Sequence, residues 1–210
     1  MQTPAHSLAL YTVGHSNHPL ERFLDLLRQH GIEAICDVRS HPYSQHCPHF
    51  NREALAAVLN DNGLHYAFFG DELGARTHDP GCYDRGKVVY ARLARIAPFQ
   101  AGLGRLRLAM RSRRVALMCA EKDPLTCHRA ILVCRHLRSD TDAILHILES
   151  GETETQSEAE LRLMDLLNIG PNLFESDEEL VERAYDTQSA RIAYEAPKAG
   201  AAPEGGEPWA

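Results

Sequence analysis

Apolar positions along the first two thirds of the chain predict short strands separated by helices. Apolar, β-rich runs that end at glycine or polar residues predict strands at 8–13, 32–40, 64–70 and 114–120. Apolar residues recur at helical spacing over 19–31 and 51–63, and Asn51 is the expected cap of the second helix. Residues 89–112 predict a helix with a break near Pro98 to Gly104, and 124–138 predict a helix behind the fourth strand.

The remaining segments differ in character. Residues 70–88 are rich in Gly, Asp and Pro and predict a long loop. Beyond Ser150 the pattern predicts two helices, at 155–167 and 176–194, the second opened by Ser176 or Asp177. The last 15 residues, 196–210, are rich in Pro, Gly and Ala and predict a disordered tail.

Strands that alternate with helices indicate an α/β fold with a mainly parallel sheet, helices on both faces in a Rossmann-like arrangement, and additional C-terminal helices. We expect a single α/β domain over 8–195, with a core at 8–148 and a helical C-terminal extension at 150–195. Ligands of such sheets bind beyond the carboxyl ends of the strands. The residues that follow strands one, two and four should therefore share a rim, with His15 within about 15 Å of Cys119.

Composition restricts the class of protein and its expected location in the cell. The apolar fraction of 44% and charged fraction of 24% are ordinary for a globular protein, and no apolar run could span a membrane. The first residues lack the pattern of a secretory signal, and the six cysteines are scattered without the spacing of a disulfide framework. We expect a cytoplasmic protein with mostly reduced thiols and no membrane partner. The sequence leaves the oligomeric state and any cofactor undetermined.

The net charge of −7 conceals an asymmetry. Seven arginines and no acid lie between Tyr90 and Arg114, whereas twelve acids and two arginines lie between Glu149 and Asp186. One interpretation is a solvated basic helix offset by an acidic one. The other is a surface that faces phosphate or nucleic acid.

Residues 118–130, MCAEKDPLTCHRA, concentrate reactive side chains on one connection. Asp123 and Pro124 predict a helix start, which places Cys127, His128 and Arg129 in or near the first turn. A helix start and an arginine both favour the thiolate form of a nearby cysteine, and the free amides attract anions. We expect an anion at the amides of 125–128 and Arg129, shared with Arg39.

The spacing excludes several familiar chemistries. Nine residues separate Cys119 from Arg129, too many for a phosphatase or rhodanese loop, and seven separate Cys119 from Cys127, which excludes a C-x-x-C pair. Walker, G-x-G-x-x-G, H-E-x-x-H and G-x-S-x-G motifs are absent. Three interpretations remain for the two cysteines: buried structural thiols, a nucleophile or redox pair, and a metal site with His128, with or without His15. The metal ligands would have to converge from two loops, so the sequence prediction is no metal.

The rim prediction yields two sets of candidate residues. Side chains suited to proton transfer or nucleophilic attack are His15, Asp37, Cys119, Glu121, Cys127 and His128. Residues suited to ligand binding are Gly14, Ser16, Arg39, Pro42, Tyr43 and Arg129. Each has a structural alternative: His15 as a polar loop residue, Asp37 and Arg39 as a salt bridge, and Glu121 as a cap or ion-pair partner.

Five motifs together resemble one family. They are YTVGHSNHPLERFLDLL, DVRSHPYS, LHYAFFGDELG, MCAEKDPLTCHR and the closing ARIAY. In this order and spacing the chain resembles the DUF488 family from about Thr12 to Tyr194. The resemblance implies a compact α/β fold and G-H-S, D-V-R, C-A-E and C-H-R site motifs, but no established reaction. One departure is Ala75, which stands where the family pattern has the second glycine of L-G-G.

The leading hypothesis is an enzyme that acts on a phosphate-bearing small molecule or a nucleic-acid component at this rim. The sequence does not choose among Cys119, Cys127 and a bound water as the nucleophile. One alternative is a non-enzymatic nucleic-acid or protein-binding module that uses the arginines of 92–114. Another is a thiol redox or sulfur-transfer protein.

Overall fold

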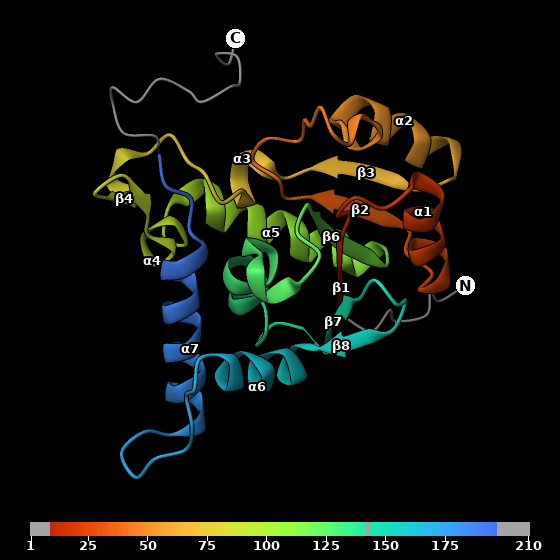
Figure 1. The fold of residues 1–210 in the computed structure, drawn as a ribbon. Coiled ribbons are helices and arrows are strands. Elements are labelled where there is room, and N and C mark those ends of the chain that lie inside the picture. Colours follow the sequence, from red (N-terminus) through yellow and green to blue (C-terminus); the bar gives the residue numbers. More distant parts are fainter. Residues whose placement is uncertain (1–8, 142, 197–210) are drawn as a thin grey trace.

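The computed structural model describes residues 9–141 and 143–196, which form a six-stranded sheet surrounded by helices (Figure 1). The strand order is β3–β2–β6–β1–β7–β8; the first five strands are parallel and β8 is antiparallel to β7. Their bounds are β1 (Ala9–Gly14), β2 (Ala34–Asp37), β3 (His65–Phe68), β6 (Val115–Cys119), β7 (Ala143–Ile147) and β8 (Thr153–Thr155). The predicted α/β class with a mainly parallel sheet is confirmed.

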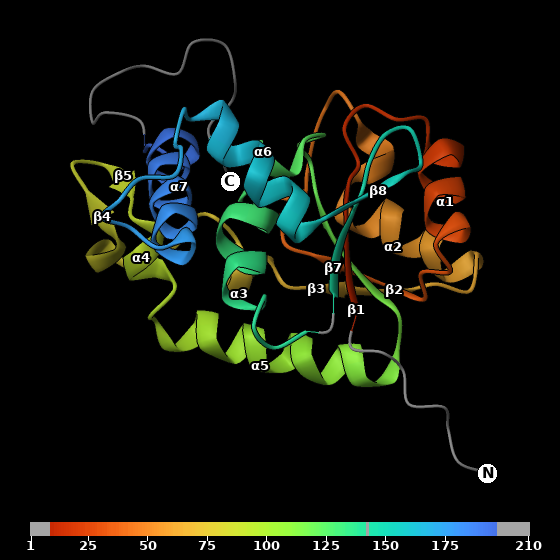
Figure 2. The same ribbon diagram turned by 90° about the horizontal axis from the view of Figure 1, so that it is seen from below.

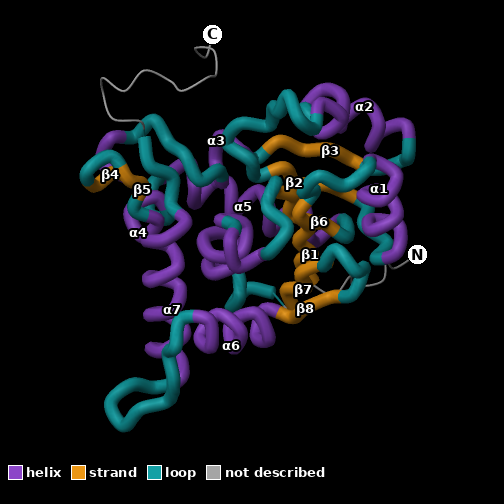
Figure 3. Tube along the Cα trace, in the orientation of Figure 1, coloured by secondary structure: helices purple, strands orange, loops and turns teal. Residues whose placement is uncertain are grey.

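Helices cover both faces of the sheet. On one face lie α1 (Leu20–Gln29) and α2 (Arg52–Asp61). The other face is covered by α5 (Ala97–Ser112) and by the C-terminal helices α6 (Gln156–Leu166) and α7 (Asp177–Ile192). The view from below shows α5 along the edge of the molecule and α6 beside α7 (Figure 2), and the strands form a continuous central layer (Figure 3).

Alternate residues of the buried strands supply two separate cores. In β6, Ala116 and Met118 pack with α1 and α2, whereas Leu117 and Cys119 point to the side of α5, α6 and α7. All five residues of β6 are buried, as expected for a central parallel strand with helices on both sides. The side chain of Cys119 therefore faces the layer that contains the C-terminal helices.

Strands β7 and β8 were not predicted: β8 is a three-residue, largely exposed polar strand, and β7 contains the buried polar side chain of His146. Its Nδ1 lies 2.8 Å from Thr12 Oγ1 on β1, and its Nε2 lies 3.0 Å from Gln156 Oε1. A histidine within a short apolar run weakens the strand pattern, and only these partners from other elements make its complete burial tolerable.

Two expected features of 70–112 are wrong in detail. The chain breaks at 94–96, between α4 (Tyr90–Leu93) and α5, and α5 continues through Gly104. Pro98 starts this helix instead of breaking it, because its missing N–H lies in the first turn where no partner is needed. The predicted loop 70–88 contains four short elements: α3 (Gly70–Leu73), a 3₁₀ turn (Pro80–Cys82), β4 (Tyr83–Asp84) and β5 (Lys87–Val88).

The predicted single helix at 124–138 is three short helical pieces. A 3₁₀ turn (Pro124–Thr126) is capped by Asp123, as expected, and a π-helical turn (Arg129–Val133) runs into a second 3₁₀ turn (Cys134–His136). The backbone at Cys127 is extended (φ −128°, ψ 138°), which interrupts the helix. π-Helical turns are rare and frequently mark functional sites.

Two expected helix starts have different outcomes. Ser176 opens α7 with a capping box that it forms with Glu179, which confirms the first of the two expected caps. Asn51 precedes α2, but its side chain does not cap that helix. Its Oδ1 accepts a hydrogen bond from the Ser44 amide at 2.7 Å, so it closes the preceding loop instead.

Arginines of the 134–138 segment hold α7 against the core. Arg135 pairs with Glu182 and Asp186, and Arg138 pairs with Glu182 at 2.7 Å. Arg138 also contacts Glu160 of α6 at 3.3 Å, and its side chain is only 20% exposed. The acid-rich segment 149–186 is therefore partly neutralised by Arg135 and Arg138 and, among the described residues, not by the arginines of 90–114.

No helix among residues 9–141 and 143–196 is long and apolar enough to cross a membrane. The tail predicted to be disordered lies, from residue 197 onward, outside the described residues.

Arg138→Ala should lower the free energy of unfolding by about 1–3 kcal/mol, because Glu160, Glu178 and Glu182 lose a largely buried partner. Urea unfolding followed by circular dichroism measures this change. Arg183→Ala is the matched control: it removes an exposed pair with Glu175 and should change stability by less than about 1 kcal/mol. Equal losses in the two variants would contradict the role given to Arg138.

Candidate functional site

The loops after β1 and β6 are joined by backbone hydrogen bonds just beyond the strand ends. The His15 amide donates to the Cys119 carbonyl at 2.9 Å, and the Ser16 amide donates to the Ala120 carbonyl at 2.9 Å. The expected shared rim is therefore present, with His15 and Cys119 on adjacent strands.

Gly14 allows this close approach. A Cβ at Gly14 would lie 1.9 Å from the carbonyl oxygen of Glu121, which no side chain can occupy. Gly14 was expected among the ligand-binding residues. Its position shows instead a packing requirement: the backbone of 121–122 passes directly over it.

Asp37 and Arg39 form a buried ion pair. Strand β2 ends at Asp37, so Arg39 can turn back and bind both carboxylate oxygens, through Nε at 2.9 Å and Nη2 at 2.6 Å. Tyr66 also donates its hydroxyl to Asp37 at 2.7 Å. This salt bridge was the structural alternative for the pair, and it leaves Asp37 fully buried. One N–H on Arg39 Nη1 has no acceptor among the described residues.

His15 is held as a neutral imidazole. Its Nε2 lies 3.1 Å from Arg39 Nη1, which can only donate, so Nε2 accepts and the proton resides on Nδ1. Nδ1 then donates to the Ser16 carbonyl at 2.8 Å, and the ring stacks on Phe50. Burial and the charge of Arg39 lower the pKa of His15 from 6.5 to about 4. His15 therefore orients Arg39.

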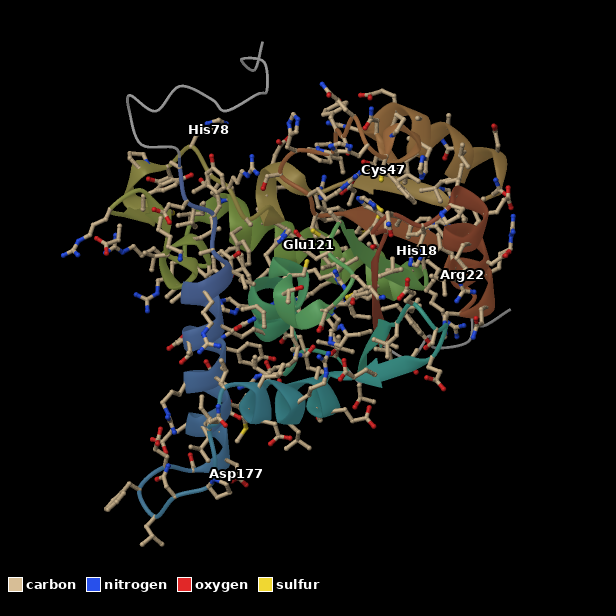
Figure 4. The ribbon with its side chains drawn as sticks, in the orientation of Figure 1. His18, Arg22, Cys47, His78, Glu121 and Asp177 are labelled. Carbon is tan, nitrogen blue, oxygen red and sulfur yellow. The ribbon has the colours of Figure 1, made fainter. Side chains whose placement is uncertain are left out.

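Four potential ligands converge at the carboxyl end of β6. Their ligating atoms all lie within 4.8 Å of one another, and we call them the Cys–Glu–Cys–His cluster: Cys119, Glu121, Cys127 and His128. Cys119 Sγ lies 3.6 Å from His128 Nδ1, and Cys127 Sγ lies 3.0 Å from Glu121 Oε2. Glu121 is exposed, whereas the other three side chains are buried. Glu121 lies near the middle of the view in Figure 4, on the segment that follows β6.

Burial and mutual contact shift the ionisation of the cluster. Burial raises the pKa of Cys119 well above its ordinary value. For Cys127, burial acts in the same direction, but the hydrogen bond from Cys119 and the charge of Arg129 prevail and lower its pKa. Burial also raises the pKa of Glu121. The pKa of His128 is raised by Cys127 despite burial.

Arg129 binds the backbone next to the cluster. Its guanidinium is fully buried and donates to the carbonyls of Glu121 at 2.5 Å and Lys122 at 3.1 Å, and to Thr12 Oγ1 at 3.3 Å. The amides expected to hold an anion are also engaged: Leu125 and Thr126 donate to Asp123, and Cys127 donates to Pro124. These contacts do not support the expected anion site at Arg129.

A pocket of about 290 Å³ opens beside the cluster. Its wall includes Cys119, Glu121 and His128 from the cluster, together with Arg39. Larger cavities of about 360, 490 and 590 Å³ lie elsewhere; among the described residues none of them is lined by cysteine, and only the 360 Å³ cavity is lined by a histidine, His136. The pocket therefore combines the candidate reactive groups with a cation.

Sequence reasoning missed other residues of this pocket. Arg76 lies at the pocket, with its guanidinium 4.2 Å from the centre of the Tyr194 ring. Tyr194 and Ile192 come from the C-terminal extension. Their only sequence signal was the closing ARIAY motif. Ala75 also lines the pocket, so a methyl group is accepted where the family pattern has glycine.

Of the six expected ligand-binding residues, only Arg39 lines this pocket; besides Gly14 and Arg129, described above, Tyr43, Pro42 and Ser16 do not. Tyr43 is exposed and donates its hydroxyl to Glu53 at 2.8 Å. Pro42 is buried, and its carbonyl accepts from the Arg52 amide. Ser16 has a positive φ of 47° and shapes the loop after β1.

Comparison with known proteins gives one family. The family model described as a domain of unknown function, DUF488, matches residues 19–135, which is more than half of the chain. The chain belongs to the DUF488 family. No curated protein and no solved structure matches the chain.

The matched DUF488 region contains the whole cluster, the Asp37–Arg39 pair and Arg129. Gly14 and His15 precede it, and the pocket residues Ile192 and Tyr194 follow it. The pocket of this DUF488 chain is thus completed by segments on both sides of the matched region.

Gly14→Ala should destabilise the fold by about 1–3 kcal/mol, because the new methyl group overlaps the Glu121 carbonyl and must displace the 121–122 backbone. Gly104→Ala is the control, since a Cβ at Gly104 meets no atom within 4 Å and the change favours helix α5. Thermal unfolding of both variants measures the change in stability. A Gly14→Ala variant as stable as the wild type would refute the close contact.

Stability should also fall on acidification in a window set by His15 and His146. The pKa of each is lowered to about 4 in the folded chain, so each binds an extra proton in the unfolded chain between about pH 6.5 and 4. The stabilisation is complete above that window and is lost as the pH falls through it, by at most about 1.4 kcal/mol per pH unit for each histidine. His15→Gln should flatten the pH dependence, whereas His78→Gln, at an exposed position, should not. The measurement is urea unfolding at a series of pH values.

Proposed function

We propose that this DUF488 protein is an enzyme that acts on a small phosphate-bearing molecule or nucleic-acid component in the 290 Å³ pocket. The observation that carries the proposal is the meeting of Arg39 and Arg76 with the Cys–Glu–Cys–His cluster in one pocket. Arginines bind phosphate oxygens through forked, permanently charged donors. The cluster supplies groups that can transfer protons or attack.

The two arginines have different tasks. Arg39 is fixed by Asp37 and His15, so its remaining N–H on Nη1 is held in place before a substrate arrives. Arg76 is exposed and has no carboxylate partner among the described residues, so it can move onto a bound anion. A fixed donor orients the substrate, and a mobile cation adds attraction.

Pocket size restricts the substrate. About 290 Å³ is at the lower end of the range for small-molecule sites, so a compact ligand fits better than a polymer. Glu121 is the exposed member of the cluster and the nearest candidate for proton transfer to or from the substrate. His128 is held by a hydrogen bond between its Nε2 and the Val38 carbonyl at 2.9 Å, which fixes Nδ1 toward the thiols.

The alternative nucleic-acid or protein-binding module has weaker support. Several of its arginines already have partners within the chain: Arg105 pairs with Glu72, Arg107 pairs with Asp140, and Arg92 donates to the Tyr83 carbonyl. A basic surface that is neutralised in this way attracts phosphate backbones less strongly. No feature of the described surface favours this alternative.

The thiol-redox alternative rests on the proximity of Cys119 and Cys127. A thiol that exchanges disulfides must be reached by its partner. Cys127 is 1% exposed and Cys119 is 3% exposed, and only Cys119 lines the pocket. Burial of both sulfur atoms favours chemistry on a small bound substrate over exchange with another protein.

Binding and turnover can be separated by two variants. Inorganic phosphate and small phosphomonoesters should raise the melting temperature of the wild-type chain, and Arg76→Ala should weaken their binding roughly tenfold or more, because a charge-assisted hydrogen bond contributes about 1.5–3 kcal/mol. Arg111→Ala, at the far end of α5, is the control and should bind as the wild type does.

Glu121→Gln should retain anion binding and lose turnover. A panel of nucleotides, nucleosides and sugar phosphates, analysed for products by mass spectrometry, provides the activity readout. The proposal fails if no member of the panel stabilises the wild-type chain, or if Glu121→Gln forms the same products at the same rate.

A further inference from the structure

The Cys–Glu–Cys–His cluster has the composition and spacing of a mononuclear metal site. A tetrahedral zinc ion with sulfur at about 2.3 Å and nitrogen or oxygen at about 2.0 Å places its ligand atoms roughly 3.3–3.8 Å apart. Cys119 Sγ and His128 Nδ1 are separated by 3.6 Å, and all four ligating atoms lie within 4.8 Å of one another. The sequence prediction of no metal rested on ligands that would have to converge from two loops, and in the fold they do converge.

The orientation of His128 is that of a metal ligand. Its Nε2 lies 2.9 Å from the Val38 carbonyl, to which it can only donate, so the neutral ring leaves a lone pair on Nδ1 directed at Cys119. Metal-binding histidines commonly donate their second ring N–H to a carbonyl or carboxylate in this way. The ring is 7% exposed, which holds this orientation fixed.

The surroundings suit thiolate ligands. Arg129 is fully buried next to Cys127, and its own backbone amide donates to Cys127 Sγ at 3.4 Å. A fixed positive charge and an amide donor stabilise sulfur in its anionic, metal-binding form. These groups lie on the protein side of the cluster, whereas Glu121 faces the pocket.

We propose that the cluster binds one zinc ion through four ligands: Cys119, Glu121, Cys127 and His128. Two sulfur ligands with one imidazole select zinc over magnesium, calcium and manganese, which prefer oxygen. Zinc displaces the thiol protons, which leave to solvent, and the ion then forms two Zn–S bonds. Glu121 is the exchangeable ligand, because it is the one exposed member of the cluster and it lines the pocket.

This inference adds a metal to the pocket of the proposed function. A bound anion that displaces Glu121 would coordinate zinc and the two arginines together, and zinc would polarise the bond that reacts. The two proposals nevertheless have separate readouts. Metal content requires no substrate, and protection by phosphate can be measured on chain stripped of metal.

The test uses the full chain, purified under reducing conditions without chelators, with zinc measured by mass spectrometry. We expect about one zinc per chain after equilibration with zinc and removal of excess, as for a single tetrahedral site. Cobalt(II) in place of zinc should give a thiolate-to-cobalt charge-transfer band and intense visible bands typical of a tetrahedral ion with sulfur ligands.

Variants identify the ligands. Cys119→Ala and Cys127→Ala should each weaken the charge-transfer band, because one of two thiolates is removed, and bind zinc at least about 100-fold more weakly, whereas Glu121→Gln should keep both sulfur ligands and bind about 10-fold more weakly. Cys36→Ala is the matched control, a buried strand cysteine outside the cluster. If the cysteine variants do not fold, His128→Gln and the cobalt spectrum of the wild type give the result instead.

Three outcomes would overturn the zinc site. The first is a wild-type chain that does not take up stoichiometric zinc or cobalt under reducing conditions. The second is equal metal loss in Cys36→Ala and Cys119→Ala. The third is a Cys119–Cys127 disulfide in peptides from freshly prepared protein, which would support the thiol-redox alternative.

Discussion

The site depends on a positive charge that is completely removed from water. Burying a guanidinium is unfavourable unless its donors are satisfied, and Arg129 meets that condition with the carbonyls of Glu121 and Lys122 and the hydroxyl of Thr12. The same hydrogen bonds fix the backbone that follows β6, over a glycine that leaves no room for a side chain. One arginine thereby sets where Glu121 stands relative to Cys127, and its charge opposes the cost of ionising a buried thiol.

The influence of Arg129 extends to the C-terminal helices through a chain of buried polar groups. Thr12 contacts His146, His146 contacts Gln156, and Tyr185 binds Gln156 and donates to Glu160 at 2.7 Å. Each group satisfies the next, which is the condition under which a polar network in a core is stabilising. This chain connects the floor of the site to α6 and α7, and α7 leads into the Tyr194 wall of the pocket. The extension beyond the DUF488 match is therefore part of the site's structure.

The sequence was informative where periodicity and topology decide the structure, and failed where tertiary partners do. Apolar runs predicted four of the six strands of the main sheet, and parallel topology brought His15 and Cys119 to one rim. Nothing in the sequence distinguishes Arg129, buried against carbonyls, from Arg76, exposed at the pocket. The strand that contains His146 was missed for the same reason, since its polar partners come from distant elements.

The members of the cluster differ in exposure: Cys119, Cys127 and His128 are buried, and Glu121 is exposed. The three buried donors are Cys119 at the end of β6, Cys127 with its extended backbone, and His128 at the start of the π-helical turn. The Val38 carbonyl orients His128, and the Arg129 amide donates to Cys127 Sγ. The fourth, Glu121, faces a pocket whose other wall has two arginines. Two thiols and a carboxylate this close together repel one another once ionised, and one imidazole and one buried arginine offset only part of that charge. A divalent cation at the proposed site would remove the remaining repulsion and leave Glu121 as the ligand that a substrate anion could replace. The repulsion within the cluster and the exposure of Glu121 thus favour entry of a ligand from the side of the pocket.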